Sequence, residues 1–279
     1  MFSTTTDDVR GISPDTISAL ITTPVQEGSV AMRVSTIIST PSTRTHIPIV
    51  SDDPTAAWVA EGAEIGATDP TVDDIVITPA KLAGLTIITN ELAADTSPEA
   101  AAIIGDGLSR DIIAKLDAAY FGSKGASAIQ PEGLEDLAGV NAVDAGAAWV
   151  NLDPFAEAIS AADIYALPLG AFVANPADAL LLAKLKDQTG SNRPLLGSDP
   201  TAPAKRTVLG VPLLTSPGVT VGTVWGIPKS RSIIVQRTNV ELAVDRSAYF
   251  TSDRTAIRAT MRLGFGFPHP AAIQKIVLE

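Results

Sequence analysis

The sequence contains no cysteine and only two histidines among its 279 residues. Disulfide bonds and thiolate chemistry are therefore excluded, and any stability beyond that of a packed core has to come from assembly. No basic segment followed by an apolar stretch occurs near Met1, and no apolar run approaches the roughly 20 residues that span a bilayer. We therefore expect a soluble protein that is not exported.

The common catalytic motifs are also missing: there is no HExxH, GxxxxGK[ST] or GxSxG, and no GxGxxG after a strand. His46 and His269 lie far apart in strand or loop sequence near proline, and a polar loop residue is the favoured interpretation of each. The carboxylates Asp52-Asp53, Asp69 and Asp73-Asp74 could gather a cation such as calcium, but they lack EF-hand spacing and a solvated loop is favoured. We expect no catalytic residue, no cofactor and no metal, and we predict that the protein is not an enzyme.

Aromatic residues make up only 5% of the chain, and the three tryptophans stand singly, which disfavours stacking on nucleic acid. The net charge is −11 and unevenly placed. Residues 1–199 hold 10 basic and 27 acidic residues, whereas residues 200–279 hold 10 basic and 4 acidic ones. An acidic chain repels phosphate, so direct duplex binding by the whole chain is disfavoured. We expect solvated or inter-subunit pairing for the basic residues spaced through the last strands, namely Arg237, Arg246, Arg254, Arg258 and Arg262.

Two strand-like segments, 57–64 and 82–92, have apolar side chains but little of their own chain to pack against. Between His46 and Pro79 the apolar runs are short, because Asp52-Asp53-Pro54 and Asp69-Pro70 interrupt them. This pattern predicts two extended arms joined by a loop. A neighbouring subunit could supply the missing apolar surface.

A long helix is predicted over 97–121. Ser97-Pro98-Glu99 combines an N-cap hydroxyl, a proline at the first helical position and an early carboxylate. The helix ends at Gly122, and Gly105 and Gly107 weaken its interior. Its predicted apolar stripe consists of Ile104, Leu108, Ile112, Leu116 and Tyr120.

The second half of the chain mixes helices and strands. Helices are predicted from Asp153-Pro154 and from Asn175-Pro176, with a buried strand over 170–174 between them. Residues 189–207 form a long polar loop that indicates a binding role. Further strands are predicted over 208–214, 223–226, 232–236, 240–244, 256–267 and 272–278.

This order of elements resembles the major capsid protein of tailed bacteriophages, with the HK97-type α+β fold. The resemblance covers nearly the whole chain. It rests on Trp58-Val59-Ala60-Glu61-Gly62-Ala63 ahead of Leu85–Leu92, and on Gly170–Pro176 leading into a leucine-rich helix. It also rests on Leu209–Leu213, Gly226 and Val240–Asp245, and on Arg258–Phe267 followed by Pro270 and Ala272-Ile273.

The resemblance implies a capsid subunit that forms hexamers and pentamers of an icosahedral head around double-stranded DNA. It implies inter-subunit contacts by Trp58, Glu61 and Glu64 of the extended loop, and an axial loop carrying Arg193, Lys205 and Arg206. The implied parts are an N-terminal arm (1–45), an extended two-stranded loop (46–84), a peripheral domain with the long spine helix (85–134), an axial domain (135–238) and peripheral strands (239–279).

The implied partners are copies of the chain itself, a separate scaffolding protein, a portal and a decoration protein, with no membrane. Assembly would take place in the cytoplasm of the bacterial host, and the product would be the shell of the virion. Some family members cross-link their shells through a loop lysine. No lysine lies near Gly62–Gly66 here, so that chemistry is not expected.

Three alternatives remain at this point. An encapsulin-type nanocompartment resembles the same fold but encloses protein cargo. An α+β enzyme with dispersed carboxylates would be a compact monomer or small oligomer with a deep polar pocket. A tail component would form tubes or rings.

Overall fold

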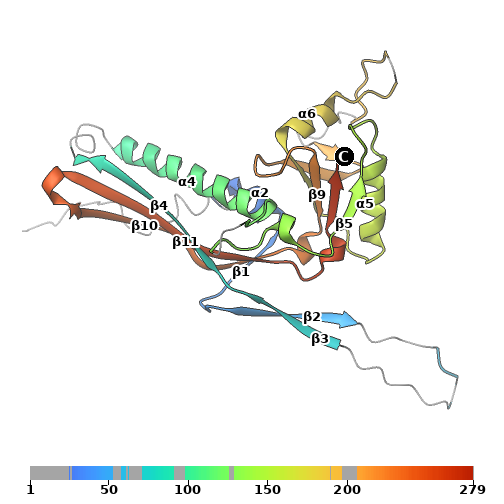
Figure 1. Ribbon diagram of the computed structural model, residues 1–279, viewed down its shortest axis with the longest axis horizontal. Coiled ribbons are helices and arrows are strands. Elements are labelled where there is room, and N and C mark those ends of the chain that lie inside the picture. The colour runs from blue at the N-terminus through green and yellow to red at the C-terminus, as the bar shows by residue number, and fades with distance from the viewer. Residues whose placement is uncertain are drawn as a thin grey trace, which may run out of the picture.

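The computed structural model describes most of the chain and mixes helices with strands (Figure 1). Its strands form a four-stranded sheet, a six-stranded sheet and a separate two-stranded hairpin. The predicted α+β class is confirmed. The described residues are 25, 27–52, 58–60, 62, 71–90, 98–125, 129–188, 190–196 and 206–278.

The four-stranded sheet has the order β1-β10-β11-β4. Its centre is the long antiparallel pair β10 (Ile233–Tyr249) and β11 (Arg254–Gly266), joined through the 3₁₀ turn η3 (Phe250–Ser252). Strand β4 (Ala80–Thr89) lies antiparallel along β11. The short strand β1 (Thr36–Ser39) lies parallel to β10 at the other edge.

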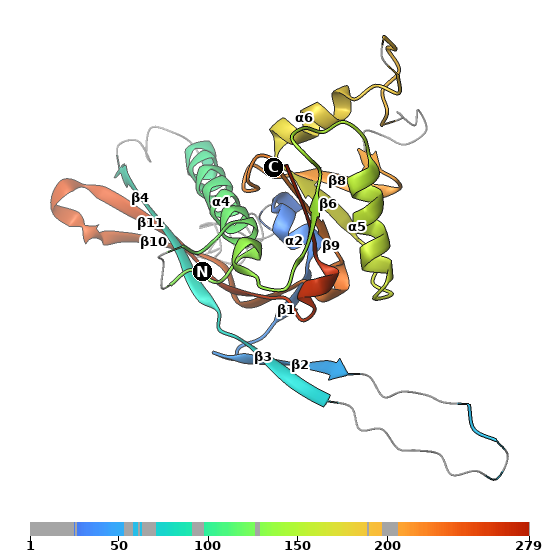
Figure 2. The same ribbon diagram turned by 45° about the vertical axis from the view of Figure 1, so that its right-hand side comes forward.

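Helix α4 (Pro98–Phe121) lies along one face of this sheet in both views (Figures 1 and 2). The predicted apolar stripe is the buried side of the helix: Leu108, Ile112, Leu116 and Tyr120 are all at most 9% exposed. The side chain of Ile104 lies outside the described ones. Gly84 of β4 allows the close approach, because a Cβ there would lie 2.6 Å from Cδ1 of Leu108.

The six-stranded sheet has the order β5-β12-β9-β6-β8-β7. Helices α5 (Asp153–Asp163) and α6 (Pro176–Lys184) pack against it, and both begin at the proline signals seen in the sequence. The strands are β5 (Asn141–Asp144), β6 (Ala171–Ala174), β7 (Thr207–Val208), β8 (Val211–Thr215), β9 (Thr223–Ile227) and β12 (Gln274–Val277).

Strand β6 connects two cores because it is buried on both faces. Phe172 packs with α5 and α6, whereas Val173 belongs to a larger core with α4 and the four-stranded sheet. Helix α2 (Val30–Val34) also packs into that larger core. The two sheets are therefore held together by one continuous apolar cluster, which explains a run of four buried residues in so short a strand.

The two-stranded hairpin projects away from both sheets (Figures 1 and 2). It pairs β2 (Thr45–Asp52) with β3 (Thr71–Ile77) in antiparallel register. At its base Ile77 packs onto β11, where Cβ atoms at Gly264 and Gly266 would come within 2.7 and 2.2 Å of the Ile77 side chain. Two extended arms joined by a loop were predicted for this segment, and the paired arms are confirmed.

Three details differ from the sequence-based expectations. The strand predicted over 208–214 is two strands, β7 and β8, because a turn at Leu209-Gly210, where both residues have positive φ, folds them into an antiparallel pair. The strands predicted over 232–236 and 240–244 are one strand, β10, because β-bulges around Thr238 absorb the irregular pattern without ending the pairing. The last strand was expected among the peripheral strands of 239–279, yet β12 pairs with β9 and β5 in the six-stranded sheet. The 3₁₀ turn η4 (Pro270–Ala272) carries the chain from one sheet to the other.

Candidate assembly surfaces

The extended loop exposes apolar side chains far from any core. Trp58 is 106% exposed and Val59 is 40% exposed. A tryptophan without any packing partner in its own described chain is a candidate anchor for a contact with another molecule. The other two predicted contact residues of this loop, Glu61 and Glu64, lie outside the described residues.

The predicted axial loop projects beyond α6 (Figure 1). Arg193 lies in its described part with an exposed side chain, and its N–H donates to the hydroxyl of Ser191. Arg206 is also exposed, next to β7, where its carbonyl accepts the N–H of Leu213. Lys205 lies outside the described residues. Both described arginines therefore have exposed side chains at the protruding end of the six-stranded sheet.

Sequence reasoning missed a buried carboxylate that joins three segments. Asp117 of α4 is 5% exposed and accepts the hydroxyl of Ser29 at 2.6 Å. It also accepts the N–H groups of Val30 and Ala31, both at 3.1 Å, and the hydroxyl of Ser216. A carboxylate at the N-terminus of α2 satisfies donors that the helix cannot pair internally. A signal was present in the helix spacing, since Asp117 lies three residues before the buried Tyr120 and four before the buried Phe121.

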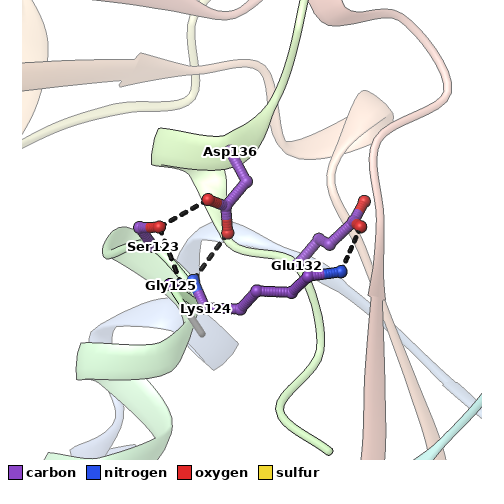
Figure 3. Close-up of polar contacts among 5 residues, drawn as sticks. All are labelled: Ser123, Lys124, Gly125, Glu132 and Asp136. Atoms are coloured by element: carbon purple, nitrogen blue, oxygen red, sulfur yellow. Dashed lines mark hydrogen bonds and ion pairs between the residues drawn. The ribbon is translucent and has the colours of Figure 1, made fainter. Parts of the chain in front are cut away.

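A second polar cluster holds the chain as it leaves α4 (Figure 3). The Asp136 carboxylate accepts the N–H of Lys124 at 2.6 Å and the hydroxyl of Ser123. These hydrogen bonds lower the pKa of the Asp136 carboxyl below its ordinary value, and the bond from the Lys124 N–H has the largest effect. Lys124 also forms an ion pair with Glu132. Residues 123–124, just after α4, are thereby held against residue 132 and the 3₁₀ turn η1 (Leu134–Asp136).

Three hydroxyl groups meet beneath α4. The hydroxyl of Ser35 donates to that of Tyr120 at 3.0 Å, and Ser232 lies within hydrogen-bonding distance of both. Burial raises the pKa of the Tyr120 hydroxyl to about 12, against the opposing effect of its serine partners. The three hydrogen-bonded hydroxyls join the start of β1, helix α4 and the start of β10. They therefore form a structural contact between the arm and the sheet.

The histidines do not form a catalytic site. His46 pairs with Asp74 on the exposed hairpin, whereas the ring of His269 caps η4 and contacts Tyr165. No group of three metal-ligating side chains occurs among the described residues, including Asp73 and Asp74. Among these residues no helix is both long and apolar enough to cross a membrane. A hollow of about 250 Å³ between β4, α4 and residues 129–131 is lined by Lys81 and Lys115 but by no carboxylate or histidine, so it lacks an acid–base pair.

Several solved structures have the same arrangement, among them a capsid and proteins of two phages. The chain is similar to the capsid of a native gene transfer agent (GTA) particle with 20% identity and a TM-score of 0.66, covering 100% of this chain and 95% of that one. It is similar to a protein of Microbacterium phage Oxtober96 with 16% identity and a TM-score of 0.71, covering 90% and 91%. For Mycobacterium phage Adephagia the identity is 15% and the TM-score 0.70, covering 90% of each chain. A search of curated proteins found no match.

The sheets, helix α4 and the projecting hairpin therefore define the HK97-type fold. The model of the phage capsid family matches residues 11–278, and the chain belongs to this family. It is a major capsid protein and not an enzyme, as predicted, and the encapsulin and enzyme alternatives are not favoured. Membership of the family places it in the capsid shell of a virion, assembled from copies of itself.

Proposed function

We propose that the chain assembles as hexamers and pentamers that close into the icosahedral head of a tailed phage around double-stranded DNA. Assembly takes place in the cytoplasm of the bacterial host. A separate scaffolding protein guides it, a portal occupies one vertex, and a decoration protein binds the outer surface. The observation that carries this proposal is the projecting β2–β3 hairpin with the fully exposed Trp58.

The hairpin and its loop support a contact between subunits because Trp58, Val59 and Val76 expose apolar side chains. Burying exposed apolar area is the main source of association free energy, and each contact is repeated over every copy in a shell. We assign Trp58, Glu61 and Glu64 to this contact. Trp58 is the described one of the three, and its side chain is fully exposed.

We assign the axial contacts around the hexamer and pentamer axes to the loop with Arg193, Lys205 and Arg206. The loop supports this role because it protrudes beyond α6 and presents exposed arginines. The proposed domains are an N-terminal arm over 1–45, an extended loop over 46–84, a peripheral domain built on the four-stranded sheet and α4, and an axial domain built on the six-stranded sheet. The pairing of β12 with β9 favours assigning β12 to the axial domain.

Expression of the chain alone, followed by size fractionation and mass measurement, tests the proposal. We expect masses of five and six copies, or closed shells, and conversion of capsomers to shells when a scaffolding protein is supplied. Nuclease-protected DNA in phage particles built from this chain tests the proposed content. Particles that hold only protein cargo would contradict that part, and a chain that stays monomeric at all concentrations would contradict the assembly itself.

A further inference from the structure

A hollow of about 250 Å³ lies between strand β4 and helix α4, which run side by side (Figures 1 and 2). Residues 129–131 form its third wall. Gly84 lets the helix approach the strand closely at Leu108, whereas the small side chains of Ala80 and Ala119 line the hollow farther along. The sizes of the side chains along the two elements therefore create the space.

Most of the wall is apolar. Leu116 and Leu263 belong to the main core, and Leu82 packs against that core. Ile129 also lines the hollow, and its side chain is 77% exposed. Apolar wall in contact with water gains free energy when another apolar group covers it.

The charged residues of the wall are two lysines, and no carboxylate lines it. Lys81 and Lys115 both have exposed side chains. Neither forms a hydrogen bond or an ion pair with another residue in the described part of the chain. Asp111, one helical turn before Lys115, is also not paired with it there. The hollow therefore combines apolar walls with unpaired positive charge.

The strand register adds a third positive charge at the same end of β4. Lys81 lies opposite Arg262 of β11, and the described residues include no ion-pair partner for Arg262 either. Like charges directly opposite each other destabilise a pair of strands. An anion bound beside Lys81 would relieve this repulsion.

The size of the hollow limits what it can hold. Pockets for larger organic ligands measure about 300–1,000 Å³, so this one suits a compact group. The ammonium group of lysine is a point charge that pairs with small anions. A bare inorganic anion would leave the apolar wall uncovered, whereas an apolar group without charge would leave both lysines unpaired. A carboxylate attached to an apolar body satisfies both parts of the wall.

We propose that this hollow is a binding site for a carboxylate carried on a compact apolar body. Lys81 and Lys115 pair with the carboxylate, and the apolar body covers Leu82 and Ile129. Such a group can come from a free small acid or from an apolar protein segment that ends in or carries a carboxylate. The site goes beyond the proposed function and does not depend on assembly.

Titration of the purified chain with hexanoate, followed by ligand-observed NMR, tests the site. Hexanol and hexylamine have the same apolar chain with no charge or with the opposite charge. The variant K81Q/K115Q removes both positive charges. K184Q/K229Q is the matched control, because it removes two exposed lysines of α6 and of η2 (Lys229–Arg231), neither of which lines the hollow. Circular dichroism checks the folding of each variant.

We expect hexanoate to bind roughly five-fold more tightly than hexanol, and hexylamine to bind most weakly of the three. K81Q/K115Q should raise the Kd for hexanoate by about the same factor, and K184Q/K229Q should match wild type. Added salt should weaken binding of hexanoate but not of hexanol.

A second variant separates the apolar contribution from the charge. A119L keeps both lysines and fills part of the hollow from its helix wall, so it should also weaken hexanoate binding. Assembly measured with and without hexanoate distinguishes the two sources of the carboxylate. Inhibition of assembly by hexanoate would identify a protein segment of the shell as the occupant, and unchanged assembly would identify a free acid.

Three results overturn the proposal. Hexanoate does not bind wild type at concentrations where the acid itself stays dispersed, or it binds K81Q/K115Q as tightly as wild type, or hexylamine binds as tightly as hexanoate. None of these results bears on whether the chain forms a shell, so the proposed function is tested separately.

Discussion

The carboxylate of Asp117 accepts the hydroxyl of Ser29 at 2.6 Å although 88 positions separate the two residues in the chain. The contact fixes the start of α2 against the spine helix, and the bond from Ser216 adds the segment between β8 and β9. One buried side chain thus sets the relative position of the arm and of elements from both sheets.

Replacing Asp117 by alanine should lower the free energy of unfolding by about 3 kcal/mol, because it leaves buried N–H and hydroxyl donors without an acceptor. Urea unfolding of the unassembled subunit measures the change. Asp111→Ala is the matched control, since Asp111 lies on the exposed side of the same helix. Equal effects of the two substitutions would show that the four bonds to Asp117 do not stabilise the fold.

The raised pKa of the Tyr120 hydroxyl predicts that the folded protein loses stability at alkaline pH. Its hydroxyl has a pKa of about 12 in the folded protein, against 10.0 ordinarily. The unfolded chain therefore releases this proton first, so the stabilising contribution is complete below pH 10 and is lost as the pH rises towards 12. The two-unit difference corresponds to about 3 kcal/mol.

Tyr120→Phe removes that titration and keeps the ring. Unfolding measured in urea between pH 8 and 12 should show a gap between wild type and Tyr120→Phe that narrows above pH 10. A gap that stays constant over this range would mean that Tyr120 titrates as it does in the unfolded chain.

The lowered pKa of the Asp136 carboxyl predicts the opposite dependence of stability on pH. Its pKa is lowered chiefly by the hydrogen bond from the Lys124 N–H, so its contribution is present at neutral pH and is lost as the pH falls through the acidic range. Asp136→Asn should reduce the acid sensitivity of the loop over 122–136. Amide hydrogen exchange of Lys124 at pH 3 and pH 6 checks this, and equal protection at both pH values in wild type would contradict it.

Two glycines near the spine helix should respond oppositely to alanine. A Cβ at Gly133 would lie 2.1 Å from the carbonyl oxygen of Gly122, so Gly133→Ala should cost about 3 kcal/mol through forced backbone movement. At Gly107, inside α4, the nearest atom is 3.8 Å away on Arg110, so Gly107→Ala should stabilise by up to about 1 kcal/mol. Thermal unfolding of both variants tests the pair. A loss of stability at Gly107 would reveal a contact that the subunit alone does not make.

Local signals in the sequence sufficed for helices α4, α5 and α6 and for most strands. Ser97-Pro98 and Asn175-Pro176 marked helix starts that the structure confirms, and spacing by four identified Leu108, Leu116 and Tyr120 as the buried face. Such patterns depend only on neighbours in the chain, which is why they can be read without a structure.

Contacts between distant segments could not be predicted in this way. No local sequence pattern indicates that Asp117 contacts Ser29, or that β12 pairs with β9 and not with the strands of the other sheet. Both contacts follow from tertiary packing. The exposed side of β11 could be predicted only in part. The spacing of Arg254, Arg258 and Arg262 was clear in the sequence, but their alignment with Leu85 and Ile87 requires the register of β4 against β11.

The most direct test of the account is a cryo-electron microscopy reconstruction of particles assembled from this chain. The account predicts a closed icosahedral shell in which the β2–β3 hairpin of each subunit contacts a neighbouring subunit. A chain that yields only monomers, or a shell in which the loop folds back onto its own subunit, would contradict it.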